Sequence, residues 1–136
     1  MNRLDGTVTA IESNGFVSLV DVAAGPHAFT ALLLESPASA PYLAVGRAVT
    51  VLFKETEVSL AKSLAGELSL RNRIPAKVVS VRRGDILSEV VLDGGAGVRL
   101  TSIVTTRAVG RLALAPGDGV EALIKANEVS LTERTA

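Results

Sequence analysis

The sequence predicts an all-β protein made of two tandem units, each with five strands and one short helix. Three features of the 136 residues lead to this prediction: an internal repeat, stretches of alternating apolar and polar residues, and glycine-rich turns between them. Since 48% of the residues are hydrophobic, the chain can form a core. Units this small bury little surface, so we expect the two units, and several chains, to associate.

The repeat is clearest near the end of each copy. Lys-Glu-Thr-Glu-Val-Ser-Leu at 54–60 recurs as Lys-Ala-Asn-Glu-Val-Ser-Leu at 125–131, an offset of 71 residues. The openings of the two copies, 4–11 and 74–81, match at an offset of 70, so a one-residue gap lies between them. We therefore predict a first domain over 1–64 and a second over 65–136.

Alternation and turn residues place the elements of the first unit. The segments 6–11 and 16–22 alternate and flank Asn14-Gly15, which predicts a β-hairpin. Ser36-Pro37 predicts a short helix, because Ser is a good N-cap and Pro suits the first helical position.

The second unit shows the same order of elements. A hairpin over 77–81 and 86–92 is followed by a glycine-rich turn at 93–97 and a strand over 98–104. Thr105 or Thr106 can cap a helix that runs to about Leu112, and two strands over 120–125 and 128–131 follow. Five short strands and one helix are the inventory of an OB-like barrel.

Composition excludes several classes of function. The 14 basic and 14 acidic residues cancel, and the chain has no cysteine and a single histidine, His27, so we expect no metal site and no disulfide. Three Phe and one Tyr leave little for nucleobases to stack on. No apolar stretch is long enough to span a bilayer and no signal peptide is evident, so we expect a cytoplasmic protein.

One segment carries the recognisable chemistry. Ser69-Leu70-Arg71-Asn72, at the entrance to the second unit, resembles the Ser-Ala-Arg-Asn signature of the Mop domain, the molybdate-binding module of molbindins. Ile103-Val104-Thr105 and the segment 120–126 agree with it, and 2–62 resembles a degenerate first copy. The chain thus resembles a di-Mop molbindin, also described as a tandem TOBE-type domain protein.

The resemblance implies a binding protein for molybdate or tungstate, with no organic cofactor. It implies that Ser69, the backbone N–H of Leu70 and Arg71 meet Thr105, Lys125 and the backbone of Ala126 across a domain or subunit interface. It also implies a homotrimer. Asn72, Asn127 and Lys54 are further candidates.

The residue types suit a tetrahedral dianion. Molybdate carries no proton at neutral pH, so its oxygens only accept hydrogen bonds, and a pocket for it needs donors and no carboxylates. Charge-assisted hydrogen bonds from Arg and Lys are the strong class. The sequence departs from the family pattern at Leu70, where Ala is usual, and at Asn127, where Ser is frequent. In the first copy, Leu34 aligns with Thr105 and nothing before Gly6 resembles the signature, so only Lys54 is retained.

Other interpretations stay open. A regulatory or adaptor module for a molybdate transporter or regulator fits the same residues. An OB-type nucleic-acid binder would use six arginines of the second half: 71, 73, 82, 83, 107 and 111. Arg71 could instead pair with Glu67, and Glu57 and Glu128 are expected to be surface or interface charges. An enzyme is not expected, because no nucleophile lies beside a base.

Overall fold

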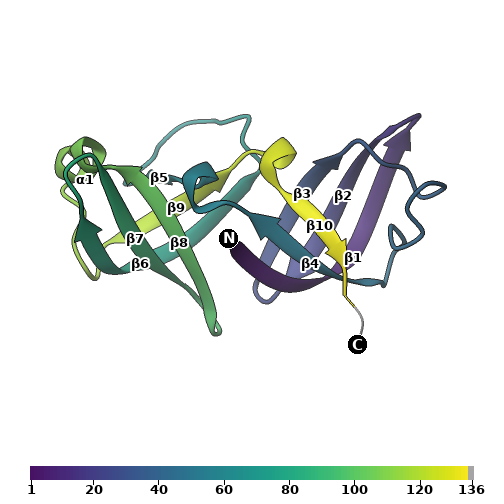
Figure 1. Cartoon of the computed structure of the whole chain (residues 1–136), viewed down its shortest axis with the longest axis horizontal. Coiled ribbons are helices and arrows are strands. Elements are labelled where there is room, and N and C mark those ends of the chain that lie inside the picture. Colours follow the sequence, from purple (N-terminus) through teal and green to yellow (C-terminus); the bar gives the residue numbers. More distant parts are fainter. Residues whose placement is uncertain (135–136) are drawn as a thin grey trace. The chain divides into compact units, whose positions relative to one another are not determined.

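The computed structural model describes residues 1–134, which form two compact units (Figure 1). Unit 1 contains Met1–Phe53 and the C-terminal segment from Lys125, and unit 2 contains Lys54–Ile124. The compact units therefore do not follow the boundaries of the sequence repeats. The last segment of each repeat has joined the unit formed by the other repeat.

Unit 1 contains one antiparallel sheet in the order β10-β4-β1-β2-β3. Its strands are β1 (Asn2–Asn14), β2 (Val17–Ala24), β3 (His27–Leu33), β4 (Ala48–Phe53) and β10 (Ser130–Glu133). A 3₁₀ turn, η2 (Ala126–Glu128), precedes β10 and packs against β3.

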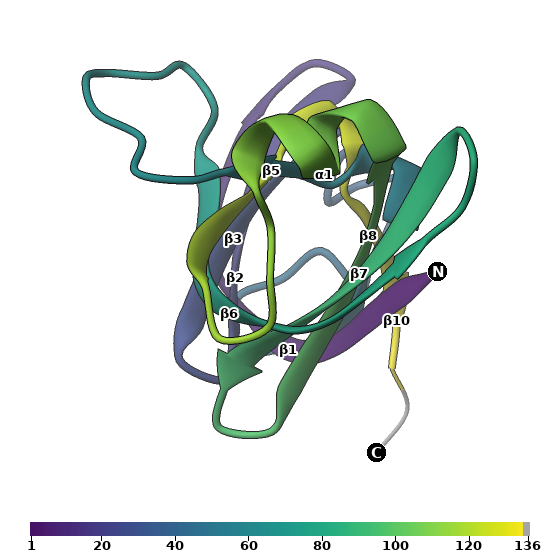
Figure 2. The same cartoon turned by 90° about the vertical axis from the view of Figure 1, so that its left-hand side faces the viewer.

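Unit 2 contains the second sheet, in the order β5-β9-β6-β7-β8. Its elements are η1 (Glu55–Glu57), β5 (Ser59–Ala61), β6 (Asn72–Arg83), β7 (Leu87–Gly95), β8 (Val98–Thr105), α1 (Thr106–Leu112) and β9 (Gly119–Ile124). The sheet curls on itself and α1 lies across one end (Figure 2). The predicted OB-like five-stranded architecture is confirmed.

The helix predicted at Ser36-Pro37 is wrong. The segment forms turns, in which the backbone N–H groups of Ser39 and Ala40 both donate to the carbonyl of Ser36. Pro41 explains the difference, because it disfavours helical geometry at Ala40 and has no N–H with which to continue a helix. The helix predicted after Thr105 is confirmed as α1.

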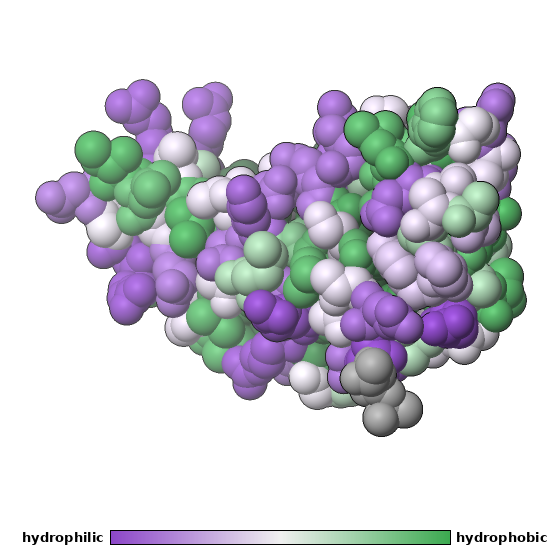
Figure 3. All heavy atoms as spheres, turned by 45° about the vertical axis from the view of Figure 1, so that its right-hand side comes forward, coloured by the Kyte–Doolittle hydropathy of each residue, from purple (hydrophilic) through white to green (hydrophobic). Residues whose placement is uncertain are grey.

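Each unit has its own core, built mainly by alternation of buried and exposed strand residues. In β2 every second residue is buried, and the Phe29 and Phe53 rings of unit 1 lie 5.9 Å apart. Ile74, Leu92 and Leu100 fill the core of unit 2. Several large apolar side chains remain exposed, among them Phe16 at 85% and Leu34 at 82%. On the face seen in Figure 3, hydrophobic and hydrophilic residues are interspersed.

The one-residue gap in the repeat is a bulge at Gly94. In unit 1, β2 and β3 pair without interruption from Val22 to Ala24, whereas the β7–β8 register shifts between Asp93 and Gly95. The extra residue therefore lies in the second hairpin of unit 2. This bulge changes the offset between the repeats from 70 to 71.

Candidate functional site

The signature segment lies directly before β6. Ser69 and Arg71 are exposed, and Leu70 is half-buried. The Arg71 guanidinium turns back on its own segment, where Nε donates to the carbonyl of Ser69 at 3.3 Å and Nη2 donates to the carbonyl of Leu68. It bonds to these carbonyls rather than to Glu67, so it is an exposed charge held near Ser69.

Asn72 differs from its neighbours because it is fully buried. It begins β6 and pairs with Ile124, the last residue of β9. Buried polar side chains are normally hydrogen-bonded, and Asn72 has polar contacts, so its burial fits a structural role at the start of β6. Arg71 precedes one member of this pair and Lys125 follows the other, so positions 71 and 125 adjoin the same end of the β6–β9 ladder.

Thr105 ends β8 and caps α1. Its Oγ1 accepts the backbone N–H of Ala108 at 3.0 Å, which leaves its hydroxyl hydrogen free to donate. The start of α1 is fixed further by Thr106, whose Oγ1 donates to the carbonyl of Gly84 at 2.7 Å and contacts Ser88 Oγ at 2.8 Å. Hydrogen bonds at the start of α1 therefore hold the exposed Thr105 in position.

The two repeated lysines begin equivalent 3₁₀ turns in different units. Lys54 precedes η1 in unit 2, where its backbone N–H donates to Glu57 Oε1 at 2.9 Å and η1 packs against β8. Glu57 is thus a capping residue. Lys125 precedes η2 in unit 1, followed by the half-buried Ala126 and the exposed Asn127.

Unit 2 contains most of the candidate donors. It contains Lys54, Ser69, Leu70, Arg71, Asn72 and Thr105, while Lys125, Ala126 and Asn127 belong to unit 1. One carboxylate near the signature is engaged elsewhere: Glu121 accepts two hydrogen bonds from Arg73, each of 2.9 Å. This hydrogen bonding lowers the pKa of Glu121 and raises that of Arg73.

Sequence reasoning missed Asn2. This residue is 6% exposed and pairs with Phe53, as Asn72 pairs with Ile124. Asn2 is therefore the counterpart of the signature asparagine in the first repeat. The offset of 70 that aligns 4–11 with 74–81 also aligns these two residues, and it was the signal that could have identified Asn2.

Two arginines of the predicted nucleic-acid groove form ion pairs. Arg73 is paired with Glu121, and Arg82, which stays largely exposed, is paired with Glu89. The aromatic residues, Phe16, Phe29, Tyr42 and Phe53, all lie in unit 1. Within residues 1–134, no group of three or more His, Cys, Asp or Glu side chains could hold a metal ion. The helices of this part of the chain are all too short or too polar to cross a membrane.

Known proteins resemble this chain in sequence and in fold. The model of the TOBE domain matches residues 1–60 and again residues 68–131. The molybdenum-pterin-binding protein MopA of Rhodobacter capsulatus is 33% identical over 132 residues, 96% of this chain and 50% of MopA. The molybdenum transport protein ModE of Herbaspirillum seropedicae is 32% identical over 94% of this chain and 48% of ModE. The chain thus spans about half the length of these relatives.

A solved structure resembles nearly the whole chain. The cytoplasmic molybdate-binding protein ModG, in a molybdate-bound form, superposes with a TM-score of 0.92 and 34% identity, covering 98% of this chain and 96% of ModG. Fold, repeat and signature together define a tandem OB-like domain protein. The chain belongs to the TOBE-domain family, with two copies of the domain.

Proposed function

We propose that this chain binds molybdate, and tungstate as an ion of nearly the same size and charge, to store or buffer molybdenum. Ser69, the backbone N–H of Leu70 and Arg71 form one half of the site. Thr105, Lys125 and the backbone of Ala126 form the other half, and Asn72, Asn127 and Lys54 support it. We further propose that each site is completed at a domain or subunit interface of a homotrimer.

The observation that carries the proposal is the position of Arg71 and Lys125 at one end of the β6–β9 ladder. Both side chains are exposed and carry several hydrogen-bond donors. Arg71 directly precedes Asn72, Lys125 directly follows Ile124, and Asn72 and Ile124 pair with each other. Charge-assisted hydrogen bonds contribute about 1.5 to 3 kcal/mol each, so a few of them offset the cost of association and give roughly micromolar affinity. The likeness to molybdate-bound ModG supports the same choice of ligand.

Calorimetric titration with molybdate tests the proposal directly. We expect saturable binding and a rise in melting temperature, because a ligand that binds only the folded state stabilises it. Sulfate and phosphate are the controls, and tungstate should compete. If molybdate gives neither heat nor a melting shift, the proposal is wrong.

The same proposal extends to location, assembly and chemistry. We infer a cytoplasmic protein that binds its ligand without converting it. The exposed Phe16 and Leu34 support association of several chains, since large apolar side chains are commonly covered in assemblies. Elemental analysis of the protein from molybdate-fed cells, with its mass in solution, counts ions and subunits together.

A regulatory or adaptor module is the second candidate. The observation that favours it is that the chain spans only about half the length of MopA and ModE. In that role the same site reports oxyanion status to a transporter or regulator. A pull-down that recovers a partner only with molybdate present supports the adaptor, and recovery of no partner in either condition favours storage.

A further inference from the structure

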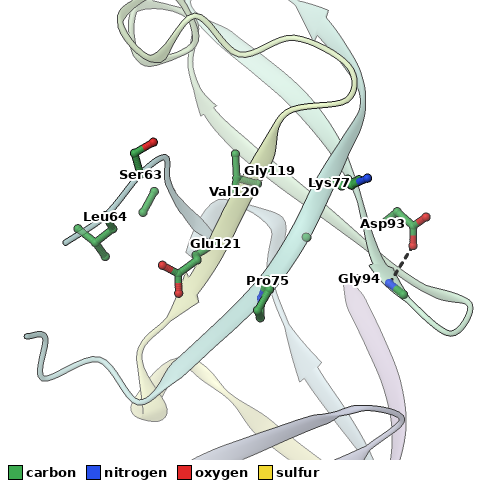
Figure 4. Close-up of a pocket in the computed structure, with 12 residues that line it drawn as sticks. Ser63, Leu64, Pro75, Lys77, Asp93, Gly94, Gly119, Val120 and Glu121 are labelled. Carbon is green, nitrogen blue, oxygen red and sulfur yellow. Dashed lines mark hydrogen bonds between the residues drawn. The ribbon is translucent and has the colours of Figure 1, made fainter. Parts of the chain in front are cut away.

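A hollow of about 580 Å³ lies on the solvent side of the unit 2 sheet. Ser63, just after β5, lines it together with Gly119 and Glu121 on β9, Pro75 and Lys77 on β6, and Asp93 on β7 (Figure 4). Pro75 and Lys77 are exposed, while Ala76 between them is buried, which places the hollow outside the core. It is separate from the signature segment.

Two backbone features create the hollow. Gly119, opposite Lys77, has no side chain, and a Cβ built there would meet nothing within 4 Å. Pairing between β5 and β9 stops at Ala61, after which Ser63 adopts a left-handed φ of 56°. The chain therefore turns away from the edge of β9 after Ala61, and the middle of this face stays uncovered.

The equivalent place in unit 1 is occupied by a guanidinium. Arg134, the counterpart of Ser63 in the repeat, donates from Nη2 to the carbonyl of Gly6 at 3.2 Å. Its Nε lies 3.8 Å from Asp5 Oδ1, and its backbone N–H donates to the carbonyl of Ala48 at 3.2 Å. Gly6, Asp5 and Ala48 align with Ala76, Pro75 and Gly119, which all line the hollow of unit 2. The same surface thus holds an arginine in one unit and none in the other.

Two carboxylates at the hollow are acceptors for a cation. Unit 2 lacks a carboxylate at the position of Asp5, but Glu121 and Asp93 supply two others. Arg73 holds Glu121 in place by two hydrogen bonds, and Asp93 Oδ1 accepts the N–H of Gly95 at 2.9 Å. Lys77 is the single basic residue among the lining residues, and with Arg73 bound to Glu121 the two cations and the two carboxylates balance.

We propose that this hollow receives an arginine side chain presented by a partner polypeptide, as the matching face of unit 1 receives Arg134. The guanidinium would lie over Gly119, donate to the carbonyl of Ala76 and face Glu121 and Asp93. A planar cation with several donors fits such a mixed surface better than an ammonium, because it bonds carbonyls and carboxylates at once. This interaction is independent of oxyanion binding.

Titration of the full-length ¹⁵N-labelled protein with the capped peptide Gly-Arg-Gly tests the proposal, with the citrulline analogue as the uncharged control. We expect saturable shifts of the Ser63, Gly94 and Gly119 amides with the arginine peptide only. Gly119→Leu should weaken binding at least tenfold by filling the hollow, and Lys77→Gln should tighten it several-fold. Gly110→Leu, at an exposed α1 position with free space, is the matched control and should leave binding unchanged.

Several outcomes would overturn the proposal. They are the absence of saturable shifts, equal binding of the citrulline peptide, and unchanged affinity in Gly119→Leu. Should Gly119→Leu lose its folded spectrum, Glu121→Gln is used in its place. This variant must weaken binding of the arginine peptide, since it removes a carboxylate from the lining. If acetate gives the same shifts through Lys77, the hollow is an anion site and the inference is wrong.

Discussion

The ammonium of Lys62 donates to Asp118 Oδ2 at 3.1 Å and to the carbonyl of Leu112 at 2.9 Å. It also donates to the carbonyl of Ala113, whose φ of 49° ends α1 in a left-handed conformation. One side chain from the segment after β5 therefore caps the helix that begins at Thr105 and fixes the loop before β9. This contact joins three parts of unit 2.

Lys62→Met should destabilise the protein. It removes three hydrogen bonds from a charged donor, but the Lys62 side chain is 31% exposed, so water recovers part of the loss. We expect the free energy of unfolding to fall by about 1 kcal/mol, measured by urea denaturation. Lys77→Met, which removes an exposed lysine on the same sheet, is the control and should change stability by less than about 0.5 kcal/mol. If the two substitutions lowered the free energy of unfolding equally, Lys62 would have no capping role.

Asp118 gives unit 2 a pH-dependent contribution to stability. The hydrogen bond from Lys62, then that from the N–H of Ala115, lowers the pKa of Asp118 below its usual value of 3.8. A carboxyl whose pKa is lower in the folded state stabilises the fold above its unfolded pKa, and the contribution is lost as the pH falls through the folded value. Asp118→Asn should therefore be less stable than the unsubstituted protein at pH 7, and the difference should shrink below about pH 4 in urea melts. A difference that stays constant with pH would contradict this linkage.

Much of the fold could be predicted from the sequence because both repeats need a glycine at the same backbone turn. Gly46 and Gly117, which the repeat aligns, have φ of 90° and 93°, and their N–H groups donate to the carbonyls of Val8 and Val78. These bonds lie where both long strands bulge. The same turn is thus required twice, and a local residue pattern reveals it.

The exchange of segments between the units could not be predicted in the same way. Lys54 and Lys125 end their repeats with the same local pattern, which fits packing on either unit equally well. Only tertiary contacts, such as η1 on β8 and η2 on β3, decide which unit each segment joins. For the site, the signature predicted candidate donors. The hydrogen bonds of Arg71 to its own segment and the position of Asn2, which follows from strand register, are visible only in the structure.

Ser102 should be the most sensitive small residue of unit 2. Its buried Oγ donates to the carbonyl of Val58 at 2.7 Å and so holds the segment after η1 against β8. Ser102→Ala leaves this carbonyl without its partner, so we expect a loss of about 1 to 3 kcal/mol in the free energy of unfolding. Unit 1 carries the buried Ala31 at the equivalent position, which shows that alanine fits sterically. Ser80→Ala, at an exposed position, is the control, and similar losses for both would contradict the prediction.

Thr105 should affect stability and binding separately. Thr105→Val removes the cap on Ala108, for which we expect a cost of about 1 kcal/mol, and it also removes the proposed donor to molybdate. Thr105→Ser keeps both the acceptor and the donor, so stability and affinity should stay close to those of the unsubstituted protein. Denaturation and calorimetry measure the two effects. If Thr105→Val loses stability but keeps its affinity, Thr105 is a cap and not a ligand.

Arg71→Met and Lys125→Met test whether the two charges at the end of the β6–β9 ladder act on one anion. Each substitution removes a charged donor, so we expect each to weaken molybdate binding about tenfold to a hundredfold by calorimetry. Stability should change little, because both side chains are exposed. Arg107→Met, an exposed arginine of α1, is the control for general charge and should change affinity by a small factor only. If both charges contact the same ion, the double variant loses less than the product of the single losses, since removal of either donor already disrupts the shared site. Independent losses would mean that Arg71 and Lys125 serve different sites.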